Sequence, residues 1–408
     1  MGQSKLRPFR PERVPQPPAL RPLPDWGAPI RTSAGEAYLV SLNEVRRVDA
    51  WARIWADARH DSRFYDILDG SVPPFEYHYL VLEDRTGTPR AIQPIFIHDQ
   101  DILAGIPPRW RRAVHLATAM SRSLSKFRIL WVGPTVGEAA LGAEPGDLPW
   151  CAWALQQALP LVARRLRARM IVLKDFPSGL RPLLQTFVDK GYTRIPSMPG
   201  VSLDLNFRDF EEHTKTLSSK TRFDLRRKRR DADRLPPVSV EVRSDISEQL
   251  DELYPLYVQT HERSGLRFER LTPEYFGRMG REMPDRARFF IWRQEGRAVA
   301  FDACLVHDGV IEASAIGMDY GVALDLHLYF IVKRDVIDWA CRNGMQRYVS
   351  GPLNYDPKLR LGFKLQPLDL YLWHRSRVVN GILKRAAPWL TPARHEPLLQ
   401  RFPNAQDL

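Results

Sequence analysis

The chain has 408 residues, and 44% of them are hydrophobic, so it is long enough to bury two cores of ordinary domain size. Its 60 Lys and Arg residues outnumber 48 Asp and Glu residues, which gives a formal net charge of +12. This charge predicts attraction to anions, whether phosphate-bearing substrates, nucleic acid or a membrane surface, and does not choose among them.

The sequence also argues against a disulfide-bonded or metal-binding protein and against a protein that spans a membrane. The three cysteines, Cys151, Cys304 and Cys341, are far apart and lack metal-ligand spacing, so neither a disulfide framework nor a metal site is expected. No apolar stretch is long enough for a transmembrane helix or a secretion signal, which predicts a cytoplasmic protein without a transmembrane segment.

Residues 1–30 carry eight prolines among scattered arginines, which predicts a disordered basic tail. A polyproline ligand for a partner domain is the alternative. The first lobe, residues 31–200, then begins with a predicted hairpin of strands 77–83 and 91–97. A helix over 153–167, a strand over 170–173, a second helix ending near Gly191 and a strand over 201–205 follow.

The same order of elements returns in the second lobe, residues 201–377. Strands are predicted over 288–292, 298–306 and 310–316, a helix over 326–342 and a strand over 347–350. The last strand, 368–373, follows Gly362-Phe363 as the strand 201–205 follows Gly191-Tyr192. Because one supersecondary plan occurs twice, the sequence predicts an α+β fold of two tandem lobes, each a mostly antiparallel sheet flanked by helices. Residues 378–408 are expected to form a helical or irregular tail.

This order is similar to the GNAT fold, and the second half carries more specific phrases. The basic run from Leu217 to Arg230 resembles the "Leu-Ser-x-x-x-Arg-x-x-x-Arg-Arg" helix of BioF2-like and Fem-type proteins. Lys358-Leu-Arg-Leu-Gly362-Phe363 resembles their Lys-x-x-x-Gly-Phe signature. The resemblance implies transfer of an acyl group from a thioester, or from an aminoacyl-tRNA in the peptidoglycan-bridge enzymes, to an amine.

The expected loop for a coenzyme A pyrophosphate, Arg/Gln-x-x-Gly-x-Gly/Ala at a helix N-terminus, is not recognisable in residues 317–325. Fem-type members also lack this loop. Acyl-coenzyme A therefore stays one candidate donor, with aminoacyl-tRNA as the other.

The basic run is interpreted either as a solvated helix face or as a dock for phosphate, because arginine binds phosphate with two parallel hydrogen bonds. The candidate phosphate-binding residues are Arg222, Arg226, Arg227 and Arg230, together with Lys364 beside the Gly-Phe pair. Their predicted ligands are an anionic or nucleotide-linked substrate, tRNA, or a peripheral anionic membrane.

Four residues are candidates for catalysis. Lys358 holds the position of the motif lysine and is predicted, in a loop leaving a strand, to stabilise an oxyanion. Asp302 interrupts the apolar strand 299–306 and is a candidate base, although a solvent-facing or capping role is the alternative. Tyr320 and Tyr355 are predicted in loops at the mouth of the second lobe, where a phenol would protonate a leaving group or simply pack.

Two functions compete at this point. The first is an N-acyltransferase with its chemistry in residues 200–375 and a cell-envelope or nucleotide-linked acceptor. The second is a non-catalytic GNAT-like protein that docks on nucleic acid or an anionic membrane through the basic helix. The sequence names neither the acyl donor nor the acceptor.

Overall fold

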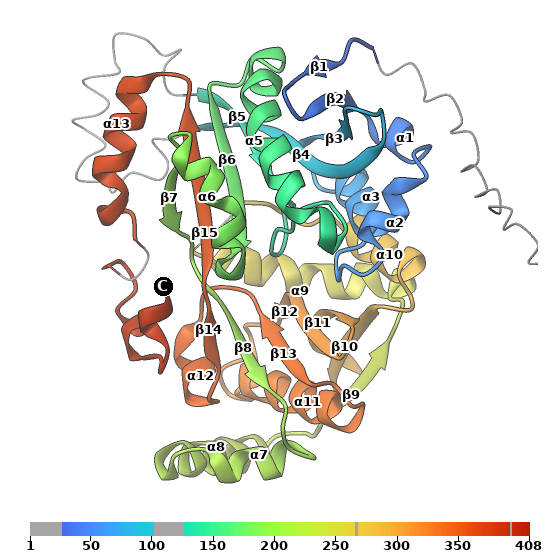
Figure 1. Cartoon of the computed structure of the whole chain (residues 1–408). Helices are drawn as coiled ribbons and strands as arrows, with labels where there is room; N and C mark the ends of the chain where they lie inside the picture. The colour runs from blue at the N-terminus through green and yellow to red at the C-terminus, as the bar shows by residue number, and fades with distance from the viewer. Residues whose placement is uncertain (1–26, 102–125, 266–267, 392–393) are drawn as a thin grey trace, which may run out of the picture.

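Two β-sheets, one above the other, organise the computed structural model of the chain (Figure 1). The structure describes residues 27–101, 126–265, 268–391 and 394–408. The predicted basic tail, residues 1–30, lies almost wholly outside the described residues.

The first sheet has eight strands. In sheet order they are β1 (Ile30–Arg31), β2 (Gly35–Val40), β3 (Glu76–Asp84), β4 (Pro89–Asp101), β5 (Lys126–Val132), β6 (Met170–Pro177), β15 (Leu368–His374) and β7 (Thr193–Pro196). The second sheet has seven strands. They are β14 (Lys364–Gln366), β8 (Gly200–Asp204), β13 (Arg347–Ser350), β12 (Val310–Met318), β11 (Arg297–His307), β10 (Ala287–Gln294) and β9 (Val238–Arg243).

Helices lie on the faces and at the ends of both sheets (Figure 1). The first lobe has α1 (Leu42–Val45), α2 (Ala50–Trp55), α3 (Ser62–Ser71), α5 (Leu148–Arg165) and α6 (Arg181–Asp189). The second lobe has α7 (Phe210–Thr216), α8 (Ser219–Ala232), α9 (Leu250–Arg263), α10 (Pro273–Glu282), α11 (Leu328–Arg342) and α12 (Tyr355–Arg360), and the tail forms α13 (Arg377–Ala386).

The predicted duplication is confirmed. In the first sheet β3, β4 and β5 pair antiparallel, α5 follows, and β6 returns parallel to β5. In the second sheet β10, β11 and β12 pair antiparallel, α11 follows, and β13 returns parallel to β12. The fold is therefore α+β with two lobes of one plan, as the sequence predicts.

The lobes exchange strands, which corrects one assignment made from the sequence. The strand 368–373 was placed in the second lobe, but β15 inserts between β6 and β7 of the first sheet. Conversely, β8 leaves the first lobe and inserts between β13 and β14 of the second sheet. Hydrophobic alternation identifies both strands but cannot say which sheet receives them, because either sheet offers the same ladder of backbone groups.

Short polar signals fix the ends of several elements. The turn between β3 and β4 holds Gly87 at φ 80°, a conformation that glycine adopts without steric cost. The Asp61 carboxylate accepts hydrogen bonds from the backbone N–H groups of Arg63 and Phe64 at the start of α3. Ser218 caps α8 in the same way by accepting from the backbone N–H of Thr221.

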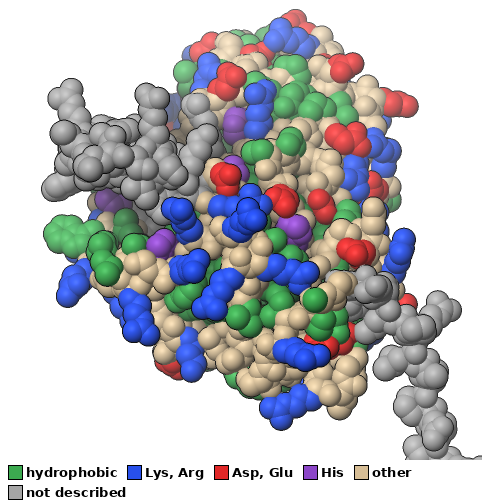
Figure 2. Space-filling view, turned by 90° about the horizontal axis from the view of Figure 1, so that it is seen from above, with side chains coloured by type: hydrophobic (Ala, Val, Ile, Leu, Met, Phe, Trp, Pro, Cys, Tyr) green, Lys and Arg blue, Asp and Glu red, His purple; other side chains and the backbone are tan. Residues whose placement is uncertain are grey.

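Positive charge is unevenly distributed on the surface. Figure 2 shows the molecule from above, with Lys and Arg side chains dominating the centre and lower left of that face and Asp and Glu more frequent toward the upper right. No described helix is long and apolar enough to cross a bilayer.

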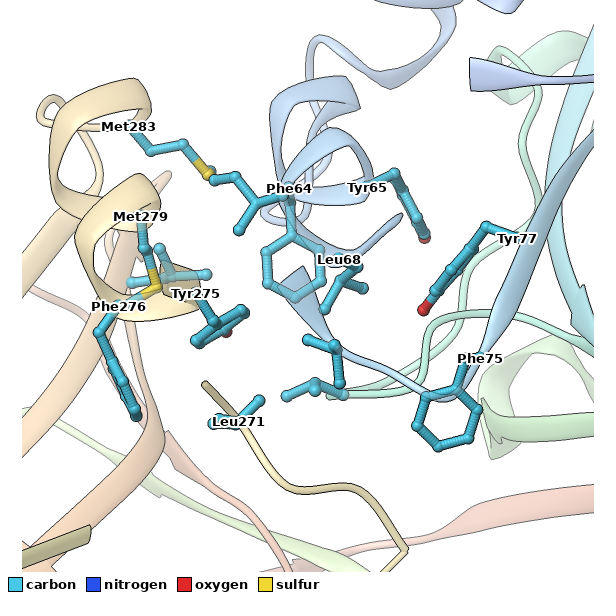
Figure 3. Packing of buried hydrophobic residues seen from close by; sticks show 14 of the residues in the cluster. Phe64, Tyr65, Leu68, Phe75, Tyr77, Leu271, Tyr275, Phe276, Met279 and Met283 are labelled. Atoms are coloured by element: carbon cyan, nitrogen blue, oxygen red, sulfur yellow. The ribbon is translucent and has the colours of Figure 1, made fainter. Parts of the chain in front are cut away.

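One hydrophobic core joins the two lobes. Phe64 and Leu68 of α3 and Tyr275 and Met279 of α10 belong to one buried cluster, which also contains Leu271 of the segment before α10 (Figure 3). A buried salt bridge also joins the lobes, because Arg286 of the second lobe pairs with Asp61 of the first at 3.3 Å. The lobes are thus held in one fixed relation, which is what allows a site to be built between them.

Candidate active site

A cavity of about 790 Å³ lies between the lobes. The first lobe lines it with residues of β5, β6 and the loop after β5, and the second lobe lines it with residues of β11, β12, α9, α11 and α12. The charged side chains in its wall include Glu138, Lys174, Asp175, Arg263, Glu269, Asp302, Glu312, Lys333 and Lys358. A cavity of this size with polar groups in its wall suits a small molecule or the reacting end of a larger one.

Lys358 lies on the cavity wall and is only 3% exposed. Its Nζ donates hydrogen bonds to the carbonyl oxygens of Gly351 at 2.7 Å and Leu353 at 2.8 Å. Leu353 and Asn354 both have left-handed backbone conformations, φ 69° and 49°, which turn the chain into the short helix that carries the lysine. Such strain is tolerated where surrounding structure enforces it, often at functional sites.

The environment of Lys358 disfavours its positive charge. Burial lowers the pKa of the Lys358 ammonium to about 7, and the nearby Lys333 cation acts in the same direction. Two of the three N–H groups of the Lys358 ammonium donate to carbonyl oxygens, so the third remains for a hydrogen bond to a reacting group. Lys358 can therefore exchange a proton, or donate a third hydrogen bond, near neutral pH.

Asp302 lies beside Lys333 and is 1% exposed. The alternative that its carboxylate faces solvent is therefore wrong. Its Oδ2 is 3.5 Å from Lys333 Nζ, and Lys333 in turn donates to the Tyr348 hydroxyl at 2.5 Å. Burial raises the pKa of the Asp302 carboxyl, while the Lys333 cation opposes that rise. The Asp302 Oδ1 has no hydrogen-bond partner, although it is fully buried. An unpaired buried oxygen in a cavity wall is an acceptor left available for a ligand.

Three further carboxylates, those of Glu138, Asp175 and Glu269, line the cavity. Glu138 lies in the loop after β5, and burial, with Glu312 nearby, raises the pKa of its carboxyl to about 7. Burial also raises the pKa of Glu269. Asp175 accepts hydrogen bonds from Lys174 Nζ at 2.6 Å and from the Ser197 hydroxyl at 2.5 Å. These carboxylates favour a cationic or proton-donating group such as an amine.

Glu312 connects the cavity to the lobe junction. It accepts from Arg59 at 2.8 Å, and His60 Nε2 lies 3.2 Å from the same oxygen. Burial alone would raise the pKa of Glu312, but Arg59 and His60 outweigh it and lower the pKa to about 2. Glu312 is therefore a fixed anion that ties the second lobe to the first.

The two predicted tyrosines have different surroundings. Tyr320 lines the cavity, and the Arg263 guanidinium lies 4.3 Å from the centre of its ring. Tyr355 is the first residue of α12, lies outside the cavity wall, and donates its hydroxyl hydrogen to the carbonyl of Pro199 at 2.8 Å. That hydroxyl secures the crossing between the lobes.

The predicted phosphate-binding residues also lie apart from the cavity, whose wall includes no residue of α8. Arg222 donates to the Leu217 carbonyl at 2.6 Å, and Arg227 pairs with Asp224 at 2.7 Å. Arg226 and Arg230 instead surround a shallow surface hollow beside the exposed ring of Phe223. Lys364 is on β14 with a 62% exposed side chain, 3.6 Å from Asp204.

The loop between β12 and α11 is the place where a GNAT pyrophosphate-binding loop is expected. Its backbone N–H groups already donate hydrogen bonds within the chain. The backbone N–H of Tyr320 donates to Gln259 Oε1, and that of Gly321 to Asp319 Oδ1. The backbone N–H groups of Val322 and Ala323 donate to the Asp319 carbonyl. An anion at this loop would have to replace bonds that the chain already makes.

Sequence reasoning missed Lys333, Tyr348 and Glu138. Lys333 had a usable signal, because it falls four residues before Ile337 and seven before Ala340 on the buried side of α11. A lysine within an apolar stripe indicates a buried partner. Glu138 had no such signal in the sequence, because it lies in a loop that only the tertiary fold brings to the cavity.

Comparisons with known proteins agree with this architecture. Residues 219–359 match the family described as an acetyltransferase (GNAT) domain. The crystal structure of FemX superposes with a TM-score of 0.52 at 11% identity, covering 86% of this chain and 100% of that one. A tandem GNAT protein from the clavulanic acid biosynthesis pathway gives 0.47 at 13% identity, covering 84% and 99%.

The C-terminal domain of a putative lysylphosphatidylglycerol synthetase from Agrobacterium fabrum also gives 0.47, at 14% identity, covering 86% of this chain and 97% of that chain. No curated protein matches the sequence. Residues 219–359 of the second lobe thus match a GNAT domain, and the whole chain has the fold of FemX. The resemblance to the GNAT fold stated from the sequence is confirmed.

Proposed function

We propose that this chain is an N-acyltransferase that moves an acyl or aminoacyl group onto an amine inside the cavity between its lobes. The observation that carries this proposal is the pairing, in a GNAT domain, of a buried lysine whose pKa is about 7 with a buried carboxylate that keeps one unpaired oxygen. The two groups line the same cavity and have complementary proton chemistry.

Lys358 suits the stabilisation of a developing oxyanion. As the acceptor nitrogen attacks the donor carbonyl, the carbonyl oxygen gains negative charge, which favours the ammonium form of Lys358. Its remaining N–H then donates to that oxygen. Because the charge is stabilised in the transition state more than in the resting cavity, the interaction lowers the barrier rather than only tightening binding.

Asp302 suits the removal of the proton from the attacking amine. The amine forms the new bond to the carbonyl carbon, and its N–H proton passes to Asp302 Oδ1. The bond to the thiolate or alkoxide leaving group then breaks, and that group takes up the proton. A carboxylate whose pKa is raised by burial is a stronger base than an exposed one. The carboxylates of Glu138 and Glu269 would hold the cationic acceptor before it reacts.

The donor is a thioester such as acyl-coenzyme A or an aminoacyl-tRNA, and the acceptor is an amine on an anionic, cell-envelope or nucleotide-linked molecule. The internally bonded loop at Asp319–Ala323 favours a donor whose phosphates bind elsewhere. The exposed arginines of α8 are one such place, since Arg226 and Arg230 lack carboxylate partners in the described contacts.

A second candidate function is favoured by that same surface. Phe223 projects beside Arg226, Arg229 and Arg230, and an aromatic ring among arginines suits stacking and phosphate contact with single-stranded nucleic acid. In this alternative the chain binds without turnover. Arg226→Gln would then abolish binding, and the cavity variant Lys358→Met would change nothing.

Ligand-dependent melting separates these functions. The intact chain is melted with coenzyme A, acetyl-coenzyme A, a long-chain acyl-coenzyme A, aminoacyl-tRNA and deacylated tRNA, each at low and high salt. A ligand that binds only the folded chain raises Tm with its concentration. The proposal expects a shift with an acylated donor that persists at high salt and is followed by transfer to an added amine. A shift with tRNA of either form, lost at high salt and without transfer, would favour the binding protein.

A further inference from the structure

The C-terminal segment gathers exposed apolar side chains. Ten large hydrophobic residues are exposed in the described part of the chain, and four of them fall between residues 378 and 390. They are Val378 at 72% exposure, Ile382 at 58%, Trp389 at 68% and Leu390 at 47%. Single exposed hydrophobic residues need no explanation, but a cluster marks an interaction site.

The helix α13 carries Val378 and Ile382, and the turn after it carries Trp389 and Leu390. It packs against β15 and β7, and Leu383 contributes to the core between the lobes from its inner face. Val378 and Ile382 are four residues apart, so they lie one above the other on the outward face. Trp389 lies in the 3-10 turn Ala387–Trp389 directly after the helix, and the Arg394 guanidinium lies 4.8 Å from the centre of its ring. No residue of α13 is buried.

Positive charge surrounds this apolar face. Residues 370–395 contain no Asp or Glu. The exposed cations of this segment are Arg375, Arg377, Lys384, Arg385 and Arg394. At the left of Figure 2, the side on which α13 lies in Figure 1, blue side chains adjoin green ones at the edge of the molecule.

We propose that α13 and the turn that follows it, residues 375–394 apart from the undescribed pair 392–393, form a docking surface for an anionic phospholipid bilayer. A short amphipathic helix binds in the plane of the headgroups, with its apolar side chains at the acyl boundary and its cations beside lipid phosphates. Tryptophan is enriched at that depth. A helix of ten residues is about 15 Å long, too short to cross a bilayer, so the contact is peripheral.

This surface differs from the basic helix α8, for which the sequence left three ligands open: a nucleotide-linked substrate, tRNA or an anionic membrane. Helix α8 combines many cations with a single large exposed apolar residue, Phe223. The α13 surface has apolar and cationic groups together, and bilayer binding requires both. The proposal goes beyond the transfer chemistry and holds whichever donor the cavity accepts.

Sedimentation with vesicles tests the proposal. The full chain is mixed with phosphatidylcholine vesicles that contain or lack phosphatidylglycerol, at low and high salt. Binding is expected only with phosphatidylglycerol, and it weakens as salt rises. Lys384→Gln/Arg385→Gln should weaken binding about twenty-five-fold, since each cation near an anionic surface contributes about fivefold. Ile382→Asp/Trp389→Ala should weaken it about tenfold or more by removing the apolar part.

The matched control removes the same charge from the last turn of α8, at Arg229, and from the turn that follows the helix, at Arg234. Arg229→Gln/Arg234→Gln should leave vesicle binding within about twofold of the wild type. Unchanged Tm in every variant shows that the lost binding is not lost folding. The proposal is overturned if the chain ignores phosphatidylglycerol at low salt, or if the α8 variant loses binding and the α13 variants keep it. It is also overturned if Ile382→Asp/Trp389→Ala converts a dimer to a monomer without changing vesicle binding, because the face would then be a protein interface.

Discussion

Lys333 Nζ lies 3.5 Å from Asp302 Oδ2, and both side chains are almost completely buried. The two residues come from α11 and β11, so the pair joins the helix to the centre of the second sheet. It also sets the charge of the cavity next to Lys358. A buried pair of this kind is costly to break from one side, because the remaining charge stays buried without its partner.

The first prediction concerns this pair. Asp302→Leu leaves the Lys333 cation uncompensated, so the free energy of unfolding should fall by about 3–5 kcal/mol. The double variant Asp302→Leu/Lys333→Met removes both charges and should recover most of that loss. Thermal melting of the two variants checks this. Equal Tm values for the single and double variants would show that the two charges do not stabilise one another.

The second prediction concerns the pH dependence of catalysis. Lys358 is required as an ammonium, and its pKa is lowered to about 7, so kcat/KM for the donor should fall as pH rises above about 7. Lys358→Arg keeps the charge at all these pH values and should lose that alkaline fall, whatever its absolute rate. A rate that instead climbs through pH 7 in the wild type, and loses the climb in Lys358→Arg, would make Lys358 the base.

Glu138 gives a prediction about stability. The pKa of its carboxyl is raised from 4.5 to about 7 in the folded chain, so the folded state holds this proton more tightly than the unfolded state. The contribution is fully present below pH 4.5 and is lost as pH rises through about 7. Glu138→Gln should therefore raise Tm relative to the wild type at pH 8 and lose that advantage near pH 4.5. A Tm difference that does not change with pH would exclude the desolvated carboxyl as its cause.

Strand exchange predicts that the lobes fold together. Residues 201–377 produced alone would carry β15 without its first-sheet partners β6 and β7, and the core shared by Phe64, Tyr275 and Met279 would be exposed. The fragment should be insoluble or lack a cooperative melting transition, whereas the full chain should melt in one transition. A fragment that melts cooperatively and binds the donor would contradict the shared core.

The fold was largely predictable because it is repeated and rests on local patterns. The hairpins, α5, α11 and the order of elements follow from periodicity and turn residues such as Gly87. The exchange of β8 and β15 did not follow, because sheet membership depends on tertiary contacts.

The candidate site was predictable only in part. Lys358 and Asp302 were both singled out, and the structure brings them to one cavity, although Lys358 lies on α12 rather than in the predicted loop. Tyr355 and the arginines of α8 were singled out by residue type, and the structure places them elsewhere. Lys333 and Glu138 enter the site through contacts between elements distant in sequence, which residue pattern does not encode.

The transfer rate of Lys358→Met bears most directly on the proposed chemistry. It is measured with the donor that raises Tm and an added amine, beside Lys364→Met, which removes an exposed lysine six residues away. Methionine keeps the apolar length of the side chain and removes the ammonium. The account predicts a loss of about a hundredfold or more in kcat for Lys358→Met, with donor binding and Tm retained, and a wild-type rate for Lys364→Met. A wild-type rate for a folded Lys358→Met variant would contradict it.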